Sequence, residues 1–361
     1  MTEPLPPITM KRSRLKTLSL DPVATAEAVN LVYVNSNDEG ILRIKSGKGF
    51  TYKQRDKVVK DKTQLHRIRS LVVPPAWEDV WICPLPNGHL QATGKDVKNR
   101  KQYRYHPLWN ELRNKTKFYR MHELGKVLPA IRKQVNKDLA LPGLPRNKVL
   151  ATVISLMEKT GIRIGNEFYE KLYGSFGLTT LKDKHVNIHG GTVKFTFRGK
   201  KGVEHQVTLK SKKLSKIVHQ CRDIPGKELF QYIDEEGKRQ SIESGMVNEY
   251  IKEVAEGEFT AKDFRTWCGS VAALNALKET GSFENEKEGK KKIVEVLDKV
   301  SMQLGNTRTV CKKYYVHPSL LEFYENGKLE KLLDKLDACE KSDDCDLKAE
   351  EKLLMSILES L

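Results

Sequence analysis

The spacing of apolar residues changes once along this chain, at Pro107, and that change limits the folds open to it. Before Pro107, short apolar runs alternate with turn residues, as in Val32–Val34, Phe50–Tyr52, Asp79–Pro84 and His89–Gly94, which is typical of β-strands. After it, apolar residues recur every three or four positions, which is typical of helices. A chain of 361 residues has room for two or three domains. We therefore expect an α+β protein, with a small β-rich N-terminal domain and a mainly α-helical domain that contains a β hairpin.

These patterns divide the chain into four segments. Residues 1–21 are rich in proline and basic residues, without periodicity, and predict a mobile arm. Residues 22–112 make the β-rich domain, with one helix near 60–70, and residues 113–318 make the helical domain. Residues 319–361 carry apolar residues at helical spacing and predict an acidic helical tail packed on that domain.

Three helices of the second domain have clear start or stop signals. The helix at 147–159 places its apolar residues on one face and stops at Gly161. The helix at 260–280 opens on Thr-Ala-Lys-Asp, which resembles a capping box. The helix at 291–304 turns five apolar residues inward and stops at Gly305.

One β hairpin is expected among these helices. Apolar residues alternate with polar ones over 193–197 and again over 203–209, and Gly-Lys-Lys-Gly joins the two runs. Lys200 lies in that turn, so its ammonium group can project from a rigid support.

The charge of the chain indicates a polyanionic partner. The net charge is +17 and the pI is near 9.4. Residues 320–361 hold six Lys and twelve acidic residues, a net charge of −6, so the rest of the chain carries +23. Lys-rich solvated surfaces are also common in other proteins, so charge alone favours nucleic-acid binding without establishing it.

Several kinds of site are missing from the sequence. Ser46–Phe50 lacks the spacing of a Walker loop, so we expect no ATP site. The six cysteines form no CxxC pair and no zinc-type cluster with histidine, which favours reduced thiols in a cytoplasmic protein and no metal or other cofactor. We found no 18-residue apolar run and no signal peptide, so we expect no membrane association.

The remaining candidates for chemistry are cationic and polar side chains and one tyrosine in the helical half. Taken singly, each has an ordinary explanation, because arginines often cap helices, hairpin lysines are usually solvated and tyrosines often pack in cores. The candidates are Arg163, Lys200, Arg265, Asn306 and Tyr315.

The segments around these candidates form ordered motifs. They read MEKTGIRIGNE around Arg163, FRGKKG around Lys200, KDFRTW around Arg265 and LGNTRTVCKKYYVHP around Tyr315. In the N-terminal half stand PPAWEDVWICP and GKDVKNRKQYRYHP, so the motifs span 74–318. The set resembles the motifs of type IB DNA topoisomerases, the small bacterial and poxviral kind, whose catalytic domain shares the fold of tyrosine recombinases.

The resemblance implies an isomerase that relaxes supercoiled double-stranded DNA. It implies transient cleavage of one strand through a 3′-phosphotyrosyl intermediate at Tyr315, without ATP or metal. It further implies a monomer that clamps the duplex, associated with the nucleoid if the protein is bacterial. We expect the linker at 110–120 to be the hinge of that clamp.

These residues also suit the chemistry on physical grounds. Exchanging a phosphodiester for a phosphotyrosine ester conserves bond energy, so rejoining needs no nucleotide. Arg163 and Arg265 stay charged and present paired donors to the phosphate oxygens. Lys200 is our candidate general acid for the leaving 5′ oxygen, although a free lysine pKa of about 10.4 would have to be lowered by neighbouring cations.

Asn306 departs from the better-known pattern of the family, in which many members carry histidine on the loop before the tyrosine. An amide can donate a hydrogen bond to a phosphate oxygen but cannot give up a proton. We therefore expect Asn306 to stabilise the transition state without acid–base work. The motif assigns the nucleophile to Tyr315 and not to the neighbouring Tyr314.

Further residues are expected to contact DNA. Lys262 lies one helical turn before Arg265 and could reach a phosphate or assist Lys200. In the β-rich domain basic and aromatic residues interleave, which suits phosphate and base contacts, although two tyrosines on one strand face can also simply pack the sheet. These candidates are Lys98, Arg100, Gln102, Tyr103 and Tyr105.

Two other functions stay open at this point. A tyrosine recombinase shares the catalytic fold, but typically carries His-x-x-Arg where this chain has Lys262-x-x-Arg265, and its N-terminal domain is usually helical. A non-enzymatic basic protein would use the same residues only as phosphate contacts.

Overall fold

The computed structural model describes residues 10–47, 49–333 and 346–360. The chain divides into two compact units, Met1–Arg120 and Met121–Leu361. The boundary between them falls within one helix, α4 (Pro107–Asp138), so the residues expected as a linker at 110–120 are helical. No helix in these described ranges is long and apolar enough to cross a membrane.

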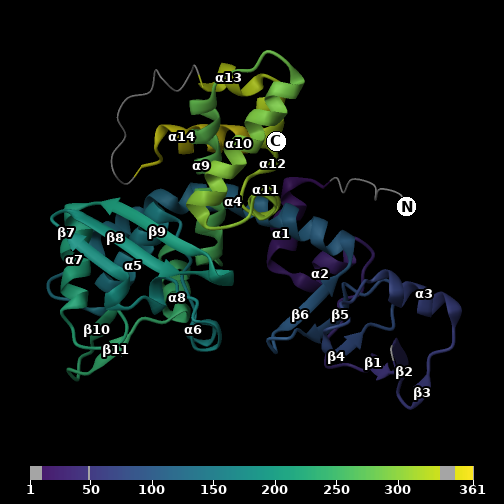
Figure 1. The fold of residues 1–361 in the computed structure, drawn as a ribbon. Helices are drawn as coiled ribbons and strands as arrows, with labels where there is room; N and C mark the ends of the chain where they lie inside the picture. The colour runs from purple at the N-terminus through teal and green to yellow at the C-terminus, as the bar shows by residue number, and fades with distance from the viewer. Residues whose placement is uncertain (1–9, 48, 334–345, 361) are drawn as a thin grey trace. The chain divides into compact units, whose positions relative to one another are not determined.

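The N-terminal unit contains a six-stranded antiparallel sheet with strand order β3-β2-β1-β4-β5-β6 (Figure 1). Ile41, Val80, Ile82 and Ala92 form its core with Ile68 of the helix α3. The β-rich N-terminal region is therefore confirmed. The elements are α1 (Arg12–Leu20), α2 (Pro22–Glu27), β1 (Ile41–Ser46), β2 (Gly49–Gln54), β3 (Lys57–Val58), α3 (Lys62–Ser70), β4 (Glu78–Ile82), β5 (Leu90–Lys95) and β6 (Lys101–Tyr105).

Two segments of this unit differ from expectation. Of the arm expected at 1–21, residues 1–9 lie outside the described residues, but Arg12–Leu20 forms the helix α1. Leu18 of α1 is fully buried against Trp109 and its neighbours, and that contact stabilises a helix whose sequence pattern is weak. Val32–Val34 is no strand, because Val32 makes only an isolated bridge to Gly88.

The C-terminal unit is mainly helical and carries a three-stranded sheet, β7-β8-β9, beside α5 and α7 (Figure 1). Besides most of α4, its elements are α5 (Arg146–Thr160), α6 (Glu167–Tyr173), β7 (Val186–His189), β8 (Thr192–Arg198), β9 (Glu204–Lys210), α7 (Lys212–Arg222), β10 (Gln231–Ile233), β11 (Arg239–Ser241), α8 (Ser244–Ala255), α9 (Ala261–Thr280), α10 (Glu286–Leu304), α11 (Arg308–Tyr314), α12 (Pro318–Glu325), α13 (Lys328–Leu333) and α14 (Ala349–Glu359).

The expected hairpin is β8 and β9, but it is not the whole β structure of this unit. Strand β7 pairs with β8, and β10 pairs with β11 in a separate two-stranded sheet. These added strands are three or four residues long, too short for alternation to separate them from a loop.

Helix α5 lies at the centre of the C-terminal unit. The sequence predicts one apolar face, yet nearly every residue from Lys148 to Met157 is buried. Helices α7, α8 and α9 and the strands β9 and β10 all pack around it. Even Lys148 is only 8% exposed, and its ammonium group donates a hydrogen bond of 2.7 Å to the Leu141 carbonyl.

Helix α9 begins and ends as the sequence predicts, whereas α10 ends as predicted at Gly305 but begins at Glu286, five residues before the expected start, where the Asn285 side chain caps it. Asp263 accepts hydrogen bonds from the backbone N–H and hydroxyl of Thr260, at 2.9 and 2.8 Å, which completes the capping box. Gly305, with φ of 57°, ends α10, and the inward residues of that helix are all buried.

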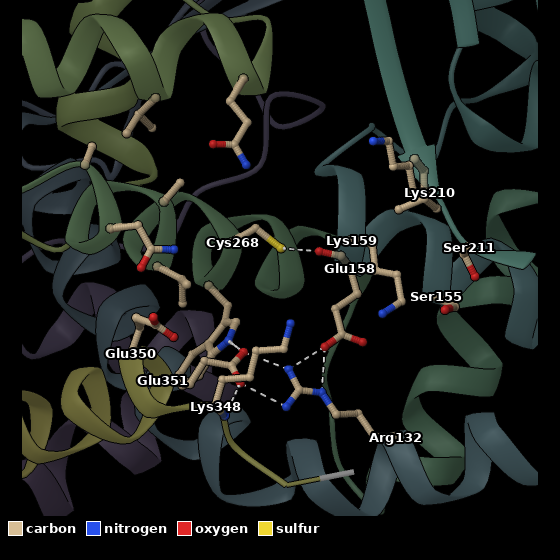
Figure 2. A pocket seen from close by; sticks show the side chains of 18 of the residues that line it. Arg132, Ser155, Glu158, Lys159, Lys210, Ser211, Cys268, Lys348, Glu350 and Glu351 are labelled. Carbon is tan, nitrogen blue, oxygen red and sulfur yellow. Dashed lines mark hydrogen bonds and ion pairs between the residues drawn. The ribbon is translucent and has the colours of Figure 1, made fainter. Parts of the chain in front are cut away.

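The described part of the tail packs on this unit through α14, which contacts α9. Arg132 of α4 donates to both carboxylate oxygens of Glu351, at 2.9 and 2.7 Å, and to Glu158 at 2.7 Å (Figure 2). Trp267 of α9 donates to the same Glu351 at 2.9 Å. This buried network fixes α14 against α4, α5 and α9. Of the tail expected at 319–361, residues 334–345 and 361 lie outside the described residues.

Candidate active site

Arg265 is held in place by the ends of two other helices. It lies in the second turn of α9 and is 5% exposed. Its Nη1 donates to the carbonyl of Gly161, the C-cap of α5, and its Nη2 to the carbonyl of Leu304, the last residue of α10. A cation is favoured at helix C-termini, where unpaired carbonyls gather. Its Nε is buried without a hydrogen-bond partner among the described residues.

Arg163 follows α5 on a segment built around close backbone packing. Its carbonyl accepts a hydrogen bond from the Leu178 N–H at 2.9 Å. Gly165, with φ of 96°, packs on Gly177, and a Cβ at Gly177 would lie 2.5 Å from the Gly165 backbone. The two glycines therefore fix the direction in which the Arg163 side chain leaves the backbone.

The Arg163 guanidinium points to the segment after α10. Its Nη2 donates to Asn306 Oδ1 and its Nη1 to the Gly305 carbonyl at 3.5 Å. Burial lowers the pKa of Arg163 to about 10, and the charge of Arg265 adds to the lowering, while the Tyr315 hydroxyl opposes it. The two guanidiniums are thus close enough to repel each other, which favours an anion between them.

Asn306 presents one unused donor. Its Oδ1 is occupied by Arg163, whereas its Nδ2 is buried without a partner at hydrogen-bond geometry among the described residues. Burial raises the pKa of the Cys311 thiol and the nearby Asn306 side chain opposes that rise, but a thiol is a weak acceptor. A buried amide N–H is costly in a folded protein unless it is paired, so Asn306 Nδ2 is suited to donate to an acceptor on a bound molecule.

Tyr315 is the C-cap of α11 and its side chain is half-buried. The Arg265 guanidinium carbon lies 5.2 Å from its ring centroid. Arg163, Arg265, Asn306 and Tyr315 are therefore brought together from four separate segments. Tyr314, by contrast, is 40% exposed.

The backbone of Tyr315 is held by α9. Ser270 Oγ donates to the Tyr315 carbonyl at 3.1 Å and accepts from the His317 N–H at 3.0 Å. A Cβ at Gly269 would lie 2.7 Å from the same Tyr315 carbonyl oxygen, so a glycine is needed for this approach. Sequence reasoning missed Ser270, because a serine inside a helix gives no signal of a long-range contact.

Lys200 is exposed at the first position of the turn between β8 and β9, a short 3-10 helix at Lys200–Gly202. The turn is compact, with Lys201 in the left-handed region at φ of 63°. The residue before Lys200, Gly199, lies against the ring of His205.

His205 is a second residue that sequence reasoning missed. It is 7% exposed and lies among the site residues, since Arg163 and Arg265 are close enough to affect its pKa. A signal was present, because His205 shares its strand parity with Val207 and Leu209. Val203, expected to point inward on the same strand face, is 40% exposed and His205 is the buried member.

The N-terminal candidates differ in their surroundings. Tyr103 and Tyr105 are 47% and 38% exposed and stack at 5.8 Å, so they share one face of β6 and do not form the sheet core. Arg100 and Gln102 both donate to Asp96 Oδ2, at 2.6 and 3.0 Å, and the hydrogen bond from the Arg100 guanidinium lowers the pKa of that carboxyl to about 2. Lys98, like Lys262 in α9, is exposed.

Helix α6 begins at Glu167, shortly after Arg163, and presents apolar side chains to solvent. None of its residues is buried, and Phe168, Tyr169 and Leu172 are 62%, 48% and 53% exposed. Apolar side chains gathered on such a surface commonly mark a binding site.

A pocket also lies away from these candidates. This pocket, of about 740 Å³, lies between α4, α5, α9, α10 and α14, and Arg132, Glu158, Cys268 and Glu351 are among its lining residues (Figure 2). The five catalytic candidates do not line it. Within the described ranges no three His, Cys, Asp or Glu side chains gather as a metal site.

Comparisons with known proteins agree on one family. A family model for the catalytic core of eukaryotic DNA topoisomerase I matches residues 101–342, and one for the N-terminal domain of bacterial DNA topoisomerase IB matches residues 49–96. DNA topoisomerase 1B of Acanthamoeba polyphaga mimivirus is 35% identical over 297 residues, which cover 80% of this chain and 88% of that protein. DNA topoisomerase 1B of Vaccinia virus (strain Copenhagen) is 26% identical over 267 residues, covering 73% and 80%.

Proposed function

Because the chain belongs to the type IB DNA topoisomerases, we propose that it relaxes supercoiled duplex DNA through a 3′-phosphotyrosyl intermediate at Tyr315, without ATP or metal. The observation that carries this proposal is the gathering of Arg163, Arg265 and Asn306 beside the Tyr315 side chain. In a bacterial cell such an enzyme works in the cytoplasm, at the nucleoid.

In the cleavage step the Tyr315 phenolic oxygen attacks the scissile phosphorus. A bond forms between that oxygen and phosphorus, and the bond from phosphorus to the 5′ oxygen breaks. The phenolic proton passes to solvent, and Lys200 gives a proton to the leaving 5′ oxygen. Rejoining reverses these steps, and because one phosphate ester replaces another, no energy source is needed.

The donors around Tyr315 meet the charge that develops on the nonbridging oxygens. Asn306 Nδ2 and Arg265 Nε are buried N–H groups without partners in the described residues, which suits them to a phosphate. Arg163 supplies further N–H groups and a second positive charge.

In this proposal the protein acts as a monomer that clamps the duplex. The N-terminal unit supplies the part of the DNA-binding surface that the catalytic unit lacks. Tyr103 and Tyr105 offer exposed rings to bases or sugars, and Lys98 offers an exposed charge to a phosphate. Arg100 and Gln102 must exchange their bonds to Asp96 for bonds to DNA.

Supercoiled plasmid incubated with the enzyme in EDTA, without ATP, tests the function. We expect relaxation of positive and negative supercoils, its complete loss in Tyr315→Phe and its retention in the matched variant Tyr314→Phe. Covalent protein on the 3′ end of the cut strand should be recovered after denaturation. Relaxation that survives in Tyr315→Phe, or that needs Mg²⁺, would overturn the proposal.

A modified substrate tests the role of Lys200. We expect Lys200→Ala to cleave ordinary DNA slowly and to recover on DNA with a 5′-sulfur leaving group, which departs without a proton. Lys201→Ala is the control and should behave as the unaltered enzyme on both substrates. Slow cleavage of both substrates by Lys200→Ala would remove the general-acid role.

A further inference from the structure

His205 lies between two glycines that belong to different parts of the site. A Cβ at Gly199, the residue before Lys200, would lie 2.6 Å from its Cδ2 and Nε2 atoms. A Cβ at Gly305, the residue before Asn306, would lie 2.5 Å from the same Nε2 atom. The edge of the imidazole ring that carries Nε2 therefore separates the Lys200 turn from the segment that carries Asn306.

The ring is fixed in this place by its own sheet. His205 on β9 pairs directly with Phe197 on β8, and the two rings stack at 4.9 Å with an angle of 1° between their planes. Phe197 is 4% exposed. Packing on a buried ring lets His205 act as a rigid spacer and not as a mobile side chain.

Gly199 is required because the His205 ring lies close to it, and not because the turn needs a glycine conformation. Gly199 has φ of −92°, which any residue adopts, yet a methyl group there would strike the ring. Gly305 has φ of 57° and ends α10, so it has a conformational reason as well. Gly199 thus reports specifically on contact with His205.

The surroundings also keep the ring neutral. Burial lowers the pKa of His205 to about 4, and the charges of Arg163 and Arg265 add to that lowering. Because the His205 ring is neutral, it adds no positive charge beside the guanidiniums of Arg163 and Arg265.

We propose that His205 is a positioning residue that docks the Lys200 turn on the Gly305–Asn306 segment, and so aligns the proton donor with the nucleophile. This inference rests on the proposed function of Lys200 as general acid. His205 itself neither touches the substrate nor transfers a proton in this scheme.

Single-turnover cleavage by His205→Ala and Gly199→Ala tests the inference, because one variant removes the spacer and the other displaces it. On ordinary DNA we expect both to slow cleavage on the order of 10²-fold, the cost of a misplacement of about 1 Å, with DNA affinity unchanged. On the 5′-sulfur substrate most of the loss should disappear. Gly245→Ala, where a Cβ has no neighbour within 4 Å, should cleave as the unaltered enzyme.

The double variant supplies a readout that general loosening of the fold would not give. Without the ring, the added methyl group at position 199 has nothing to strike, so Gly199→Ala/His205→Ala should be no slower than His205→Ala. Losses that add up in the double variant would contradict the docking role.

Lys200→Ala on the 5′-sulfur substrate separates the two proposals. If that variant is not rescued, the general-acid proposal fails, and the alignment role of His205 that rests on it fails with it. If Lys200→Ala is rescued but the folded His205→Ala and Gly199→Ala are not, the positioning role of His205 is wrong. If His205→Ala does not fold, Gly199→Ala decides the same question alone.

Discussion

Asn306 uses its two amide atoms for different purposes. Its oxygen accepts from Arg163 and orients that guanidinium, while its nitrogen is buried without a partner in the described residues. Sequence reasoning identified hydrogen bonding as the one role left to an amide at this position. It had no means to show that the two ends are divided in this way.

Asn306→Asp tests the role of the Nδ2 donor separately from that of the Oδ1 acceptor. The variant keeps an oxygen for Arg163 but replaces the N–H donor with a second oxygen that repels the phosphate. We expect single-turnover cleavage to slow by about 10²- to 10³-fold, as for loss of one transition-state donor. Asn326→Asp, at the exposed end of α12, is the control. Cleavage by Asn306→Asp at the unaltered rate would show that the donor plays no part.

Ser270→Ala tests how far the backbone of the nucleophile depends on α9. The change removes both bonds that join Ser270 to Tyr315 and His317, each worth about 1 kcal/mol. We expect the cleavage rate to fall about 10-fold, with little change in DNA affinity. Ser215→Ala, which removes a similar bond of 2.8 Å to Gly190 away from the site, should affect stability alone. Equal cleavage rates for both variants would contradict this role of Ser270.

At the scale of elements, helices with their own start and stop signals were predictable and those defined by their neighbours were not. Thr260, Asp263 and Gly305 mark helix ends through local bonds, so α9 and the end of α10 followed from the sequence. Helix α5 is buried on nearly all sides because other elements surround it, and such burial leaves no single-faced pattern.

The candidate site shows the same division. Arg163, Lys200, Arg265, Asn306 and Tyr315 belong to motifs that a sequence displays. Strand parity could have indicated that His205 is buried, but its contact with Gly305, a hundred positions away, is not encoded locally. The contact of Ser270 with Tyr315, forty-five positions away, left no signal in the sequence.

Helix α6 exposes apolar side chains that a binding partner would cover. Its exposed rings follow Arg163 along the chain, so we expect them to contact DNA near the cleaved phosphate. Tyr169→Ala removes a ring whose burial against DNA is worth about 1.5 to 3 kcal/mol, so affinity should fall by up to that amount in a binding titration with duplex DNA. Val294→Ala, at a 38% exposed site on α10, is the control. Unchanged affinity in Tyr169→Ala would leave α6 without this function.

For the whole molecule, buried histidines link stability to pH, and His205 and His317 have the largest shifts. Burial lowers the pKa of both His205 and His317 to about 4, while an unfolded histidine titrates near 6.5. Between these values the unfolded chain binds more protons than the folded chain. The free energy of unfolding should therefore fall as pH falls from about 6.5 to 4, by at most about 1.4 kcal/mol per pH unit for each histidine.

Chemical denaturation across that pH range checks this expectation. His317 Nδ1 accepts from the Ser319 N–H and caps α12, and Asn is also a good cap, so His317→Asn should reduce the slope without losing the helix. His66→Asn, at an exposed site in the N-terminal unit, is the control. If the slope of the free energy of unfolding against pH were unchanged in His317→Asn, groups other than His317 would cause the pH dependence.

One helix carries both Arg265 and the serine that holds the Tyr315 backbone, five positions apart. In the proposed reaction the cut strand is free to swivel while its other end remains on the tyrosine. Because the charge that stabilises the transition state and the covalently loaded tyrosine are attached to a single rigid element, swivelling of the DNA does not separate them. The returning 5′ hydroxyl then meets the geometry that released it, however many turns have passed.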